Sequence, residues 1–387
     1  MKNIGFIGYG LRSDTMMEAF TALELDIAVA AIADPRSGEL RESLSQKAFF
    51  ENTSYYNTAE EMLQNENLDG VFVGTRCALH AELAALALSR GIPLFLEKPV
   101  CINSAQYALL LNAGKGMENR VVVSFPLRLT SIVQEMKQLV DSGALGDIVT
   151  VQAINNVPYG NVYYHSWYRD ASLTGGLFLQ KSTHDIDYIT YILGKRPTNV
   201  TAQTAKMYFK GDKPANLRCE DCAENHTCTE SSYTAKHILN EVPTGEYCCF
   251  ATDTGNEDVA AAIFTCDDGT IISYHQVFLV KNSAGRRGAR FIGTKGSAEF
   301  DFYTATIHVD YYSSKHSADH SFTFPQGTHF GGDKQLALAF MDVLNGKESR
   351  SNLSEGLASA AACLGAKKSA ETHSIVTIDY GFDKIWQ

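Results

Sequence analysis

Two glycines near the N-terminus could bring the backbone close to a phosphate group. In the segment GFIGYGL, the residues Gly8, Tyr9, Gly10 and Leu11 join an expected strand directly to an expected helix. Glycines in such a turn let the backbone approach a pyrophosphate, which amide groups at a helix N-terminus can bind. The dinucleotide-binding fingerprint has a third glycine where this chain has the small Ser13. The pattern favours a dinucleotide site over the alternative, an ordinary strand–turn–helix.

The residue that ends the second expected strand is acidic. Asp34 lies roughly 20 residues after the glycines, where the fingerprint places a carboxylate that accepts hydrogen bonds from the adenosine ribose. The same charge would repel a 2′-phosphate, so NAD is expected rather than NADP. Arg36 could accommodate that phosphate, and NADP therefore stays open as the less favoured cofactor.

The first 124 residues alternate between strand-like runs and segments with helical spacing, which predicts a parallel sheet covered by helices on both faces. The strands are expected at residues 3–7, 27–33, 70–73, 93–96 and 121–124. Open parallel sheets bind ligands at the carboxyl ends of their strands, where Thr75, His80, Glu97 and Lys98 lie. We expect these four residues to contact the cofactor, with a structural packing role equally open for His80.

Length, charge and composition limit the possible functions. A chain of 387 residues exceeds one ordinary core, so we expect two domains, residues 1–124 and 125–387. A formal net charge of −11, without a Lys/Arg-rich run, argues against a nucleic-acid partner. The longest apolar run, residues 27–33, is far too short to span a membrane. The chain starts without a signal-peptide pattern and has cysteines scattered singly in apolar segments, so we expect a cytoplasmic protein.

From residue 125 onward, strands follow one another and helices are grouped apart, which predicts an α+β domain on a largely antiparallel sheet. One helix is expected over residues 176–193, after two glycines. His184 lies four residues after Gln180 and three after Lys181, and Asp187 continues the same face. We expect Gln180 and Asp187 to contact the substrate. A lone histidine on a helix is more often structural than catalytic, but a lysine and a histidine one helical turn apart are less easily explained by structure alone.

The segment YYHSWYRD is dense in aromatic residues and contains Tyr164, His165, Trp167 and Arg169. Aromatic rings can cover the flat faces of sugar rings, and the polar tips of tyrosine and histidine can bind hydroxyls. Arg169 could grip a carboxylate or phosphate, and Arg128 is a weaker candidate of the same kind. The segment predicts part of a substrate site, with an aromatic-rich core segment as the alternative.

Five segments spread over essentially the whole chain together resemble the Gfo/Idh/MocA (glucose-fructose oxidoreductase / inositol dehydrogenase) family. They are GFIGYG with its downstream aspartate, EKPV, VDSGALGDIVTV, TGGLFLQKSTHDIDY and RFIGTKGSAEF. The resemblance implies a Rossmann domain followed by an α/β domain whose open sheet often mediates oligomerisation, hence a homodimer or homotetramer. It also implies hydride transfer between a nicotinamide and a secondary alcohol of a sugar, sugar acid or cyclitol.

By the same resemblance, Lys98 of EKPV looks like the catalytic lysine and His184 of THDID like the catalytic histidine. Many dehydrogenases of the family carry an aspartate four residues before that histidine, where this chain has Gln180, followed by Lys181. The chain therefore looks like a branch with a KSxHD pattern. The two catalytic groups, which come from different domains, are expected to meet in the interdomain cleft.

Acid–base chemistry suits these two residues. Oxidation of a CH–OH group requires removal of the hydroxyl proton as hydride leaves carbon. A neutral imidazole such as His184 has a reference pKa of about 6.5 and can accept that proton, whereas lysine, at about 10.4, is a poor base. We expect a protonated Lys98 to stabilise the developing alkoxide, with the reverse assignment open. Lys181 could lower either pKa by like-charge repulsion.

A separate cysteine-rich segment, CEDCAENHTC, contains Cys219, Cys222 and Cys228. It belongs to an expected insertion at about residues 209–250, which the resembled branch also carries. The first pair has the spacing of a zinc knuckle, so a structural zinc is chemically plausible. Free thiols in a loop are the alternative.

Two other functions use the same residues. Some members of the resembled family are glycosidases that oxidise a ring hydroxyl transiently, eliminate the aglycone and return the hydride. The change to Gln180 and the pair of Lys181 and His184 keep that function open. A non-catalytic regulator that binds NAD would tolerate loss of Lys98 and His184, and the presence of both residues argues weakly against it.

Overall fold

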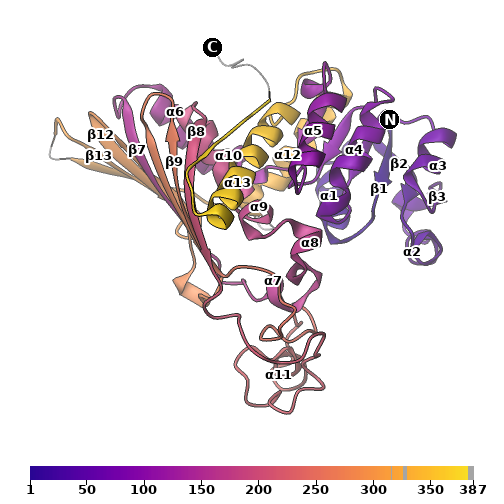
Figure 1. The fold of residues 1–387 in the computed structure, drawn as a ribbon. Helices are drawn as coiled ribbons and strands as arrows, with labels where there is room; N and C mark the ends of the chain where they lie inside the picture. The colour runs from indigo at the N-terminus through magenta and orange to yellow at the C-terminus, as the bar shows by residue number, and fades with distance from the viewer. Residues whose placement is uncertain (315, 326–328, 382–387) are drawn as a thin grey trace. The chain divides into compact units, whose positions relative to one another are not determined.

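The computed structural model describes residues 1–314, 316–325 and 329–381. They form two compact units (Figure 1). The first unit comprises Met1–Gln134, Phe324–Ala361 and Asp379–Gln387, and the second comprises Glu135–Thr323 and Ala362–Ile378. The domain boundary expected between residues 124 and 125 stays a prediction.

Within the described residues, the first unit contains a parallel sheet of six strands in the order β3-β2-β1-β4-β5-β6. This order is that of a dinucleotide-binding Rossmann fold and confirms the expected class. The strands are β1 (Lys2–Ile7), β2 (Ile27–Ala33), β3 (Ser54–Tyr56), β4 (Gly70–Val73), β5 (Leu94–Leu96) and β6 (Val121–Val123). The helices that alternate with them are α1 (Leu11–Ala22), α2 (Ser37–Leu44), α3 (Ala59–Asn65), α4 (His80–Leu88) and α5 (Ser104–Ala113).

Aromatic side chains fill the core of this unit. Phe72 of β4 stacks on Phe95 of β5, with ring centroids 4.6 Å apart. Phe340 meets Phe95 edge-on at 5.7 Å, and it comes from α12 (Gly332–Leu344), more than 200 residues later in the chain. Parallel strands buried on both faces read as continuous apolar runs, which explains why β1, β2, β4, β5 and β6 could be recognised from the sequence.

The second unit contains a sheet of nine strands among the described residues, in the order β14-β13-β12-β11-β7-β10-β9-β8-β15. Its neighbouring strands pair antiparallel except β7 and β10, which are parallel, so the expected largely antiparallel open sheet is confirmed. The strands are β7 (Ile148–Asn156), β8 (Pro197–Ala205), β9 (Val259–Cys266), β10 (Ile271–Val277), β11 (Arg286–Gly293), β12 (Gly296–Asp301), β13 (Thr306–Tyr311), β14 (Ser317–Ser321) and β15 (Val376–Thr377).

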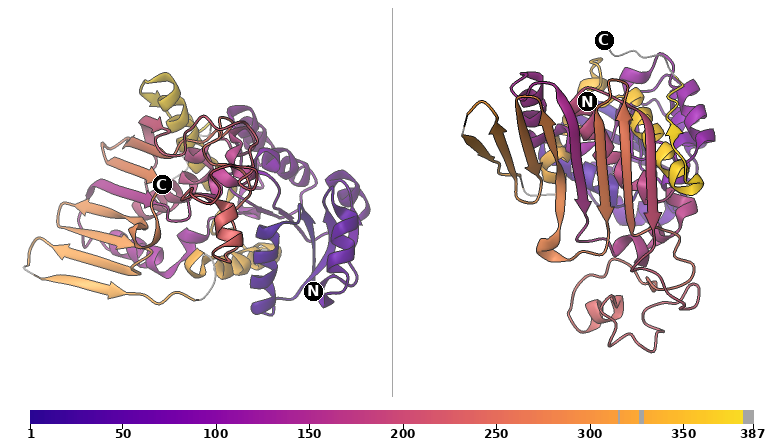
Figure 2. Two further views of the ribbon diagram at one scale, coloured as in Figure 1. Left: turned by 90° about the horizontal axis from the view of Figure 1, so that it is seen from below. Right: turned by 60° about the vertical axis from the view of Figure 1, so that its left-hand side comes forward.

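Helix α10 (Ser182–Leu193) covers one face of this sheet, where Tyr188 meets the rings of Phe300 and Phe302 edge-on. The other face is open, as the right-hand view of Figure 2 shows. Accordingly, buried and exposed side chains broadly alternate along β7 and β10. Two further helices, α6 (Ser131–Asp141) and α13 (Leu353–Thr372), each belong partly to each unit.

The segment before α10 departs from the expected single helix over residues 176–193. Two helices occupy it, α9 (Leu177–Gln180) and α10, and Lys181 lies at the junction between them. The expectation of one continuous helix was therefore wrong. The short helices α7 (Val162–His165) and α8 (Ala171–Thr174) precede this junction, and α11 (Ser232–His237) lies in the loops that separate β8 from β9.

Candidate active site

The glycine turn after β1 has the geometry that a pyrophosphate needs. Gly8 has a φ of +79°, which residues with a side chain rarely adopt, and a Cβ there would lie 2.6 Å from the Thr75 methyl group. Gly10 caps α1 without a side-chain hydrogen bond, and a Cβ at this position would meet nothing within 4 Å. Ser13, in place of the third glycine, donates a hydrogen bond to the Gly8 carbonyl oxygen at 3.0 Å. The turn therefore keeps its shape while the helix N-terminus stays accessible.

Asp34 ties this turn to the end of β2. Its carboxylate accepts hydrogen bonds from the backbone N–H of Tyr9 at 3.0 Å and of Arg36 at 2.9 Å. The Arg36 guanidinium donates two more, both at 3.0 Å. Burial alone would raise the pKa of Asp34, but these hydrogen bonds outweigh it and lower that pKa. An ionised carboxylate is thus held beside the glycine turn, and a ribose that binds it must displace the half-exposed Arg36 side chain.

His80 links the segments that follow β4 and β5. Its Nδ1 lies 2.8 Å from the Pro99 carbonyl oxygen, and its Nε2 lies 3.1 Å from that of Thr75. Burial lowers the pKa of His80 despite these two carbonyls. The Lys98–Pro99 peptide bond is cis. These contacts give His80 a structural role, and direct contacts of Thr75, His80 and Lys98 with a cofactor stay predictions.

Arg12 was missed by the sequence analysis. Its Nε donates to Glu97 at 2.7 Å, and its Nη2 contacts Asp333 at 2.6 Å and donates to Ser124 at 3.1 Å. A cation in the first turn of a helix opposes the helix dipole, and this unfavourable position was the available signal that Arg12 has a specific partner. Glu97, expected as a cofactor contact, is therefore engaged by Arg12, and a contact with the cofactor stays a prediction.

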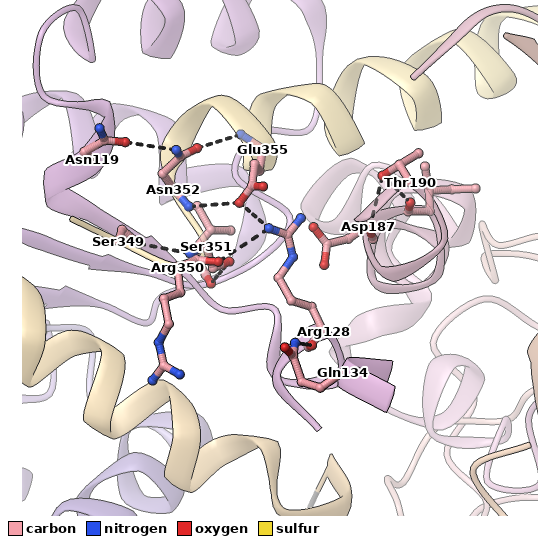
Figure 3. Close-up of polar contacts among 12 residues, drawn as sticks. Asn119, Arg128, Gln134, Asp187, Thr190, Ser349, Arg350, Ser351, Asn352 and Glu355 are labelled. Carbon is pink, nitrogen blue, oxygen red and sulfur yellow. Dashed lines mark hydrogen bonds and ion pairs between the residues drawn. The ribbon is translucent and has the colours of Figure 1, made fainter. Parts of the chain in front are cut away.

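Arg128 is buried and forms an ion pair with Glu355 at the start of α13 (Figure 3). The Gln134 side chain donates to the Arg128 carbonyl oxygen at 2.7 Å. On the other side of Glu355, Asn352 bonds to Asn119 at 3.0 Å. These contacts hold the 126–134 segment within the first unit, and the predicted contact of Arg128 with substrate remains untested.

In the second unit, a buried ion pair fixes α10 on its sheet. The Asp185 carboxylate accepts hydrogen bonds from Asn155 at 2.6 Å, Tyr274 at 2.7 Å and Arg287 at 2.7 Å. Asp185 is fully buried, and these donors from β7, β10 and β11 satisfy its charge. The adjacent His184, which is also buried, is thereby held on a rigid helix.

Lys181 lies at the junction of α9 and α10, where it precedes the first residue of α10. Its Nζ donates a hydrogen bond of 2.6 Å to the hydroxyl of Tyr159, which follows β7. Gln180 and Asp187, both predicted substrate contacts, are buried. The sequence analysis therefore placed Lys181 near His184 in the chain but missed its partner Tyr159, whose only signal is its place at a strand end.

The aromatic segment is mostly buried against its own unit. Tyr164 stacks on Phe209 with ring centroids 3.9 Å apart, and the His165 Nδ1 lies 2.5 Å from the Tyr247 carbonyl oxygen. Arg169 forms an ion pair with Asp253. These contacts give the three residues a structural role in holding the segment between β8 and β9. Trp167 stacks on its neighbour Tyr168 at 3.9 Å, and substrate contacts of the segment stay predictions.

The cysteine-rich segment does not form the suggested zinc site. Residues 1–314, 316–325 and 329–381 contain no group of three or more His, Cys, Asp and Glu side chains that could hold a metal ion. The Cys219 thiol instead approaches the Tyr247 carbonyl oxygen at 3.7 Å, while Cys222 and Cys228 are half-buried. Burial raises the pKa of Cys228. In the same ranges, no helix has the length and apolar character needed to cross a membrane.

Two family models match this chain. Residues 2–125 match the oxidoreductase family with an NAD-binding Rossmann fold, and residues 133–299 match the GFO/IDH/MocA C-terminal domain. The chain belongs to the Gfo/Idh/MocA oxidoreductase family. The expected family, an NAD-binding Rossmann domain and an oxidoreductase are thereby confirmed.

Named proteins are similar to this chain over different shares of its length. YteT of Bacillus subtilis, named as an oxidoreductase, is 25% identical over 90% of this chain and 90% of its own. The myo-inositol 2-dehydrogenase of Thermotoga maritima is 26% identical over 51% of this chain and 57% of its own. A structure of levoglucosan dehydrogenase in complex with NADH and levoglucosan superposes with a TM-score of 0.75 at 18% identity, covering 97% of this chain and 99% of that one.

Proposed function

We propose that this oxidoreductase uses NAD to move a hydride to or from a secondary alcohol of a sugar, sugar acid or cyclitol. The observation that carries the proposal is the placement of Lys98 just after β5. In a parallel sheet, this is the edge that also carries the glycine turn and Asp34, so the lysine lies on the cofactor side of the fold. Relatives named as dehydrogenases of myo-inositol and levoglucosan support a polyhydroxylated substrate.

The chemistry divides between two residues. Bound NAD supplies the hydride acceptor. His184 accepts the hydroxyl proton as a neutral imidazole, and Lys98 donates a hydrogen bond to the developing alkoxide. The rigid attachment of α10 through Asp185 supports this role for His184, because a general base must be held within hydrogen-bond reach of its proton. Gln180 and Asp187, which lie four residues before and three after His184, are the proposed substrate contacts on this segment.

The cofactor preference and the assembly follow the same reasoning. The ionised Asp34 favours NAD, because its charge opposes a 2′-phosphate. The open face of the nine-stranded sheet supports a homodimer or homotetramer, since an uncovered sheet with alternating apolar residues can pair with a second copy. A glycosidase that oxidises its substrate only transiently is a second candidate, because Gln180 stands where many dehydrogenases of the family carry an aspartate.

An assay of purified protein with NAD separates these functions. The substrates are free sugars, sugar acids, cyclitols and aryl glycosides, and the readouts are NADH absorbance and release of the aryl group. We expect NADH to accumulate with a polyol, and Lys98→Ala and His184→Ala each to lower kcat by about 100-fold or more. Lys115→Ala and His237→Ala, which change exposed residues of the same types, are the matched controls. Aryl release without net NADH would indicate the glycosidase, and full turnover by both catalytic variants would refute the assignment.

A further inference from the structure

Lys98 lies on a short segment that is enclosed on both sides of it. Residues 93–100 are buried apart from Lys98, which is half-buried. Its two neighbours in the chain, Glu97 and Pro99, are each held by a side chain from another element of the first unit. The lysine side chain is thus the accessible part of a segment whose backbone is buried.

Arg12 holds the residue that precedes the lysine. The Glu97 backbone N–H donates to the Val73 carbonyl oxygen at 3.0 Å, which extends the pairing of β5 with β4. The Glu97 carboxylate accepts a hydrogen bond of 2.7 Å from the Nε of Arg12. Arg12 also donates to the Ser124 hydroxyl at 3.1 Å, and the Ser124 N–H donates to the Leu96 carbonyl oxygen at 2.9 Å. The backbone and the side chain of Glu97 are therefore both fixed at the carboxyl end of β5.

A second carboxylate keeps the Arg12 guanidinium in this place. The Nη2 of Arg12 lies 2.6 Å from Asp333 at the start of α12, and the Nδ1 of His329 lies 2.9 Å from the same carboxyl group. A cation in the first turn of α1 opposes the helix dipole, so these partners rather than α1 account for an arginine here. The planar guanidinium can bind several acceptors at fixed angles, which the ammonium group of a lysine cannot.

His80 holds the residue that follows the lysine. The His80 Nδ1 lies 2.8 Å from the Pro99 carbonyl oxygen, and its Nε2 lies 3.1 Å from that of Thr75. His80 is buried at the first position of α4. Farther along, the Gln106 side chain of α5 accepts a hydrogen bond of 2.9 Å from the Ile102 N–H. The chain after the lysine is thus held from α4 and α5.

We propose that Arg12 and His80 are positioning residues that hold Lys98 for its hydrogen bond to the reacting oxygen. This inference rests on the proposed function. A lysine side chain is long and flexible, and its donor must lie about 3 Å from the oxygen on which charge develops. A misplacement of about 1 Å can cost about 100-fold in rate. Because both neighbours of Lys98 are fixed, the place from which its side chain starts is fixed too.

Hydrogen exchange in the protein alone, followed by mass spectrometry, tests whether the two residues hold this segment. We expect Arg12→Lys and His80→Leu each to speed amide exchange in residues 97–102 by about 10-fold or more, because contacts that close the segment are lost. Exchange in β1 should stay as in the wild type. Arg90→Lys and His237→Leu, at exposed residues, are the matched controls. Unchanged exchange in residues 97–102, or exchange that speeds equally in β1, would overturn the proposal whatever the substrate proves to be.

A double-mutant cycle then shows whether Arg12 and His80 act through Lys98. At saturating NAD and alcohol, we expect Arg12→Lys and His80→Leu each to lower kcat by about 10-fold or more. In the Lys98→Ala background, each should change kcat by less than about twofold, because no amine is left to position. A loss of the same factor in both backgrounds would refute positioning and indicate a merely structural role. Full turnover by Lys98→Ala would instead refute the proposed function itself, so the two failures are distinguishable.

Discussion

Replacement of Asp34 by alanine should weaken binding of NADH by about 30-fold. In the structure, the carboxylate accepts two hydrogen bonds from backbone N–H groups and two from the Arg36 guanidinium. A bound ribose would take the place of the guanidinium and donate two hydrogen bonds to a charged acceptor, worth about 3 kcal/mol or more in total. Displacement of the half-exposed Arg36 costs at most about 1 kcal/mol. The difference of about 2 kcal/mol corresponds to roughly 30-fold in Kd.

Calorimetric titration with NADH and NADPH measures this effect. Asp34→Ala should also lose the preference for NADH over NADPH, because no negative charge then opposes the 2′-phosphate. Arg36→Ala should bind NADH at least as well as the wild type does, and NADPH less well. Asp34→Asn keeps one oxygen for the Tyr9 N–H and separates loss of charge from loss of the turn. Glu42→Ala, at an exposed residue of α2, is the acidic control. A Kd for NADH within about twofold of wild type in Asp34→Ala would show that the carboxylate does not bind the ribose.

Three further predictions concern stability. Arg12→Met should lower the free energy of unfolding by about 3–5 kcal/mol, because the buried Glu97 and Asp333 lose their shared cation, although Asp333 keeps its contact with His329. An unchanged denaturant midpoint would contradict this. Gly160→Ala should unfold at a clearly lower temperature than the wild type, since its Cβ would lie 1.9 Å from the Phe278 carbonyl oxygen. The control Gly38→Ala, in open space on α2, should be as stable as the wild type or slightly more stable. Equal melting temperatures of the two variants would contradict this. The hydrogen bond to His329 and the charge of Arg12 lower the pKa of Asp333 despite its burial. The stability that the Asp333 carboxylate contributes is therefore present above the unfolded pKa of about 3.9 and is lost as the pH falls below that value. The Asp333→Asn variant should therefore lose less stability than the wild type between neutral pH and pH of about 3, and identical pH dependence would contradict this.

The sheet of the first unit was predictable because its central strands are short apolar runs followed by glycine or charged residues. The edge strand β3 was missed, since Ser54–Tyr56 has only three half-buried residues and no apolar run. The packing of α12 into the core of the first unit could not be predicted from the sequence either, because the contact between Phe340 and Phe95 joins residues far apart in the chain. Local pattern specifies such a helix but not the core it joins.

For the site, residue types were more predictable than their partners. The glycine turn and Asp34 follow from local spacing, and the structure places them in hydrogen-bond contact. The pairs of Arg12 with Glu97 and of Tyr159 with Lys181 join separate elements, so spacing gives no sign of them. Knuckle spacing likewise brings cysteines close in the chain but does not specify a complete set of metal ligands, and the described residues contain no such group.

The central claim is that Lys98 and His184 support hydride transfer to NAD, and isotope transfer tests it most directly. Polyols deuterated at the carbinol carbon are incubated with NAD and protein, and the mass of the reduced cofactor is measured. The account predicts deuterated NADH with the wild type and a loss of about 100-fold or more in its rate of formation with Lys98→Ala or His184→Ala. Deuterium transfer at the wild-type rate in both variants, or NAD binding by the wild type with no transfer from any polyol, would contradict it.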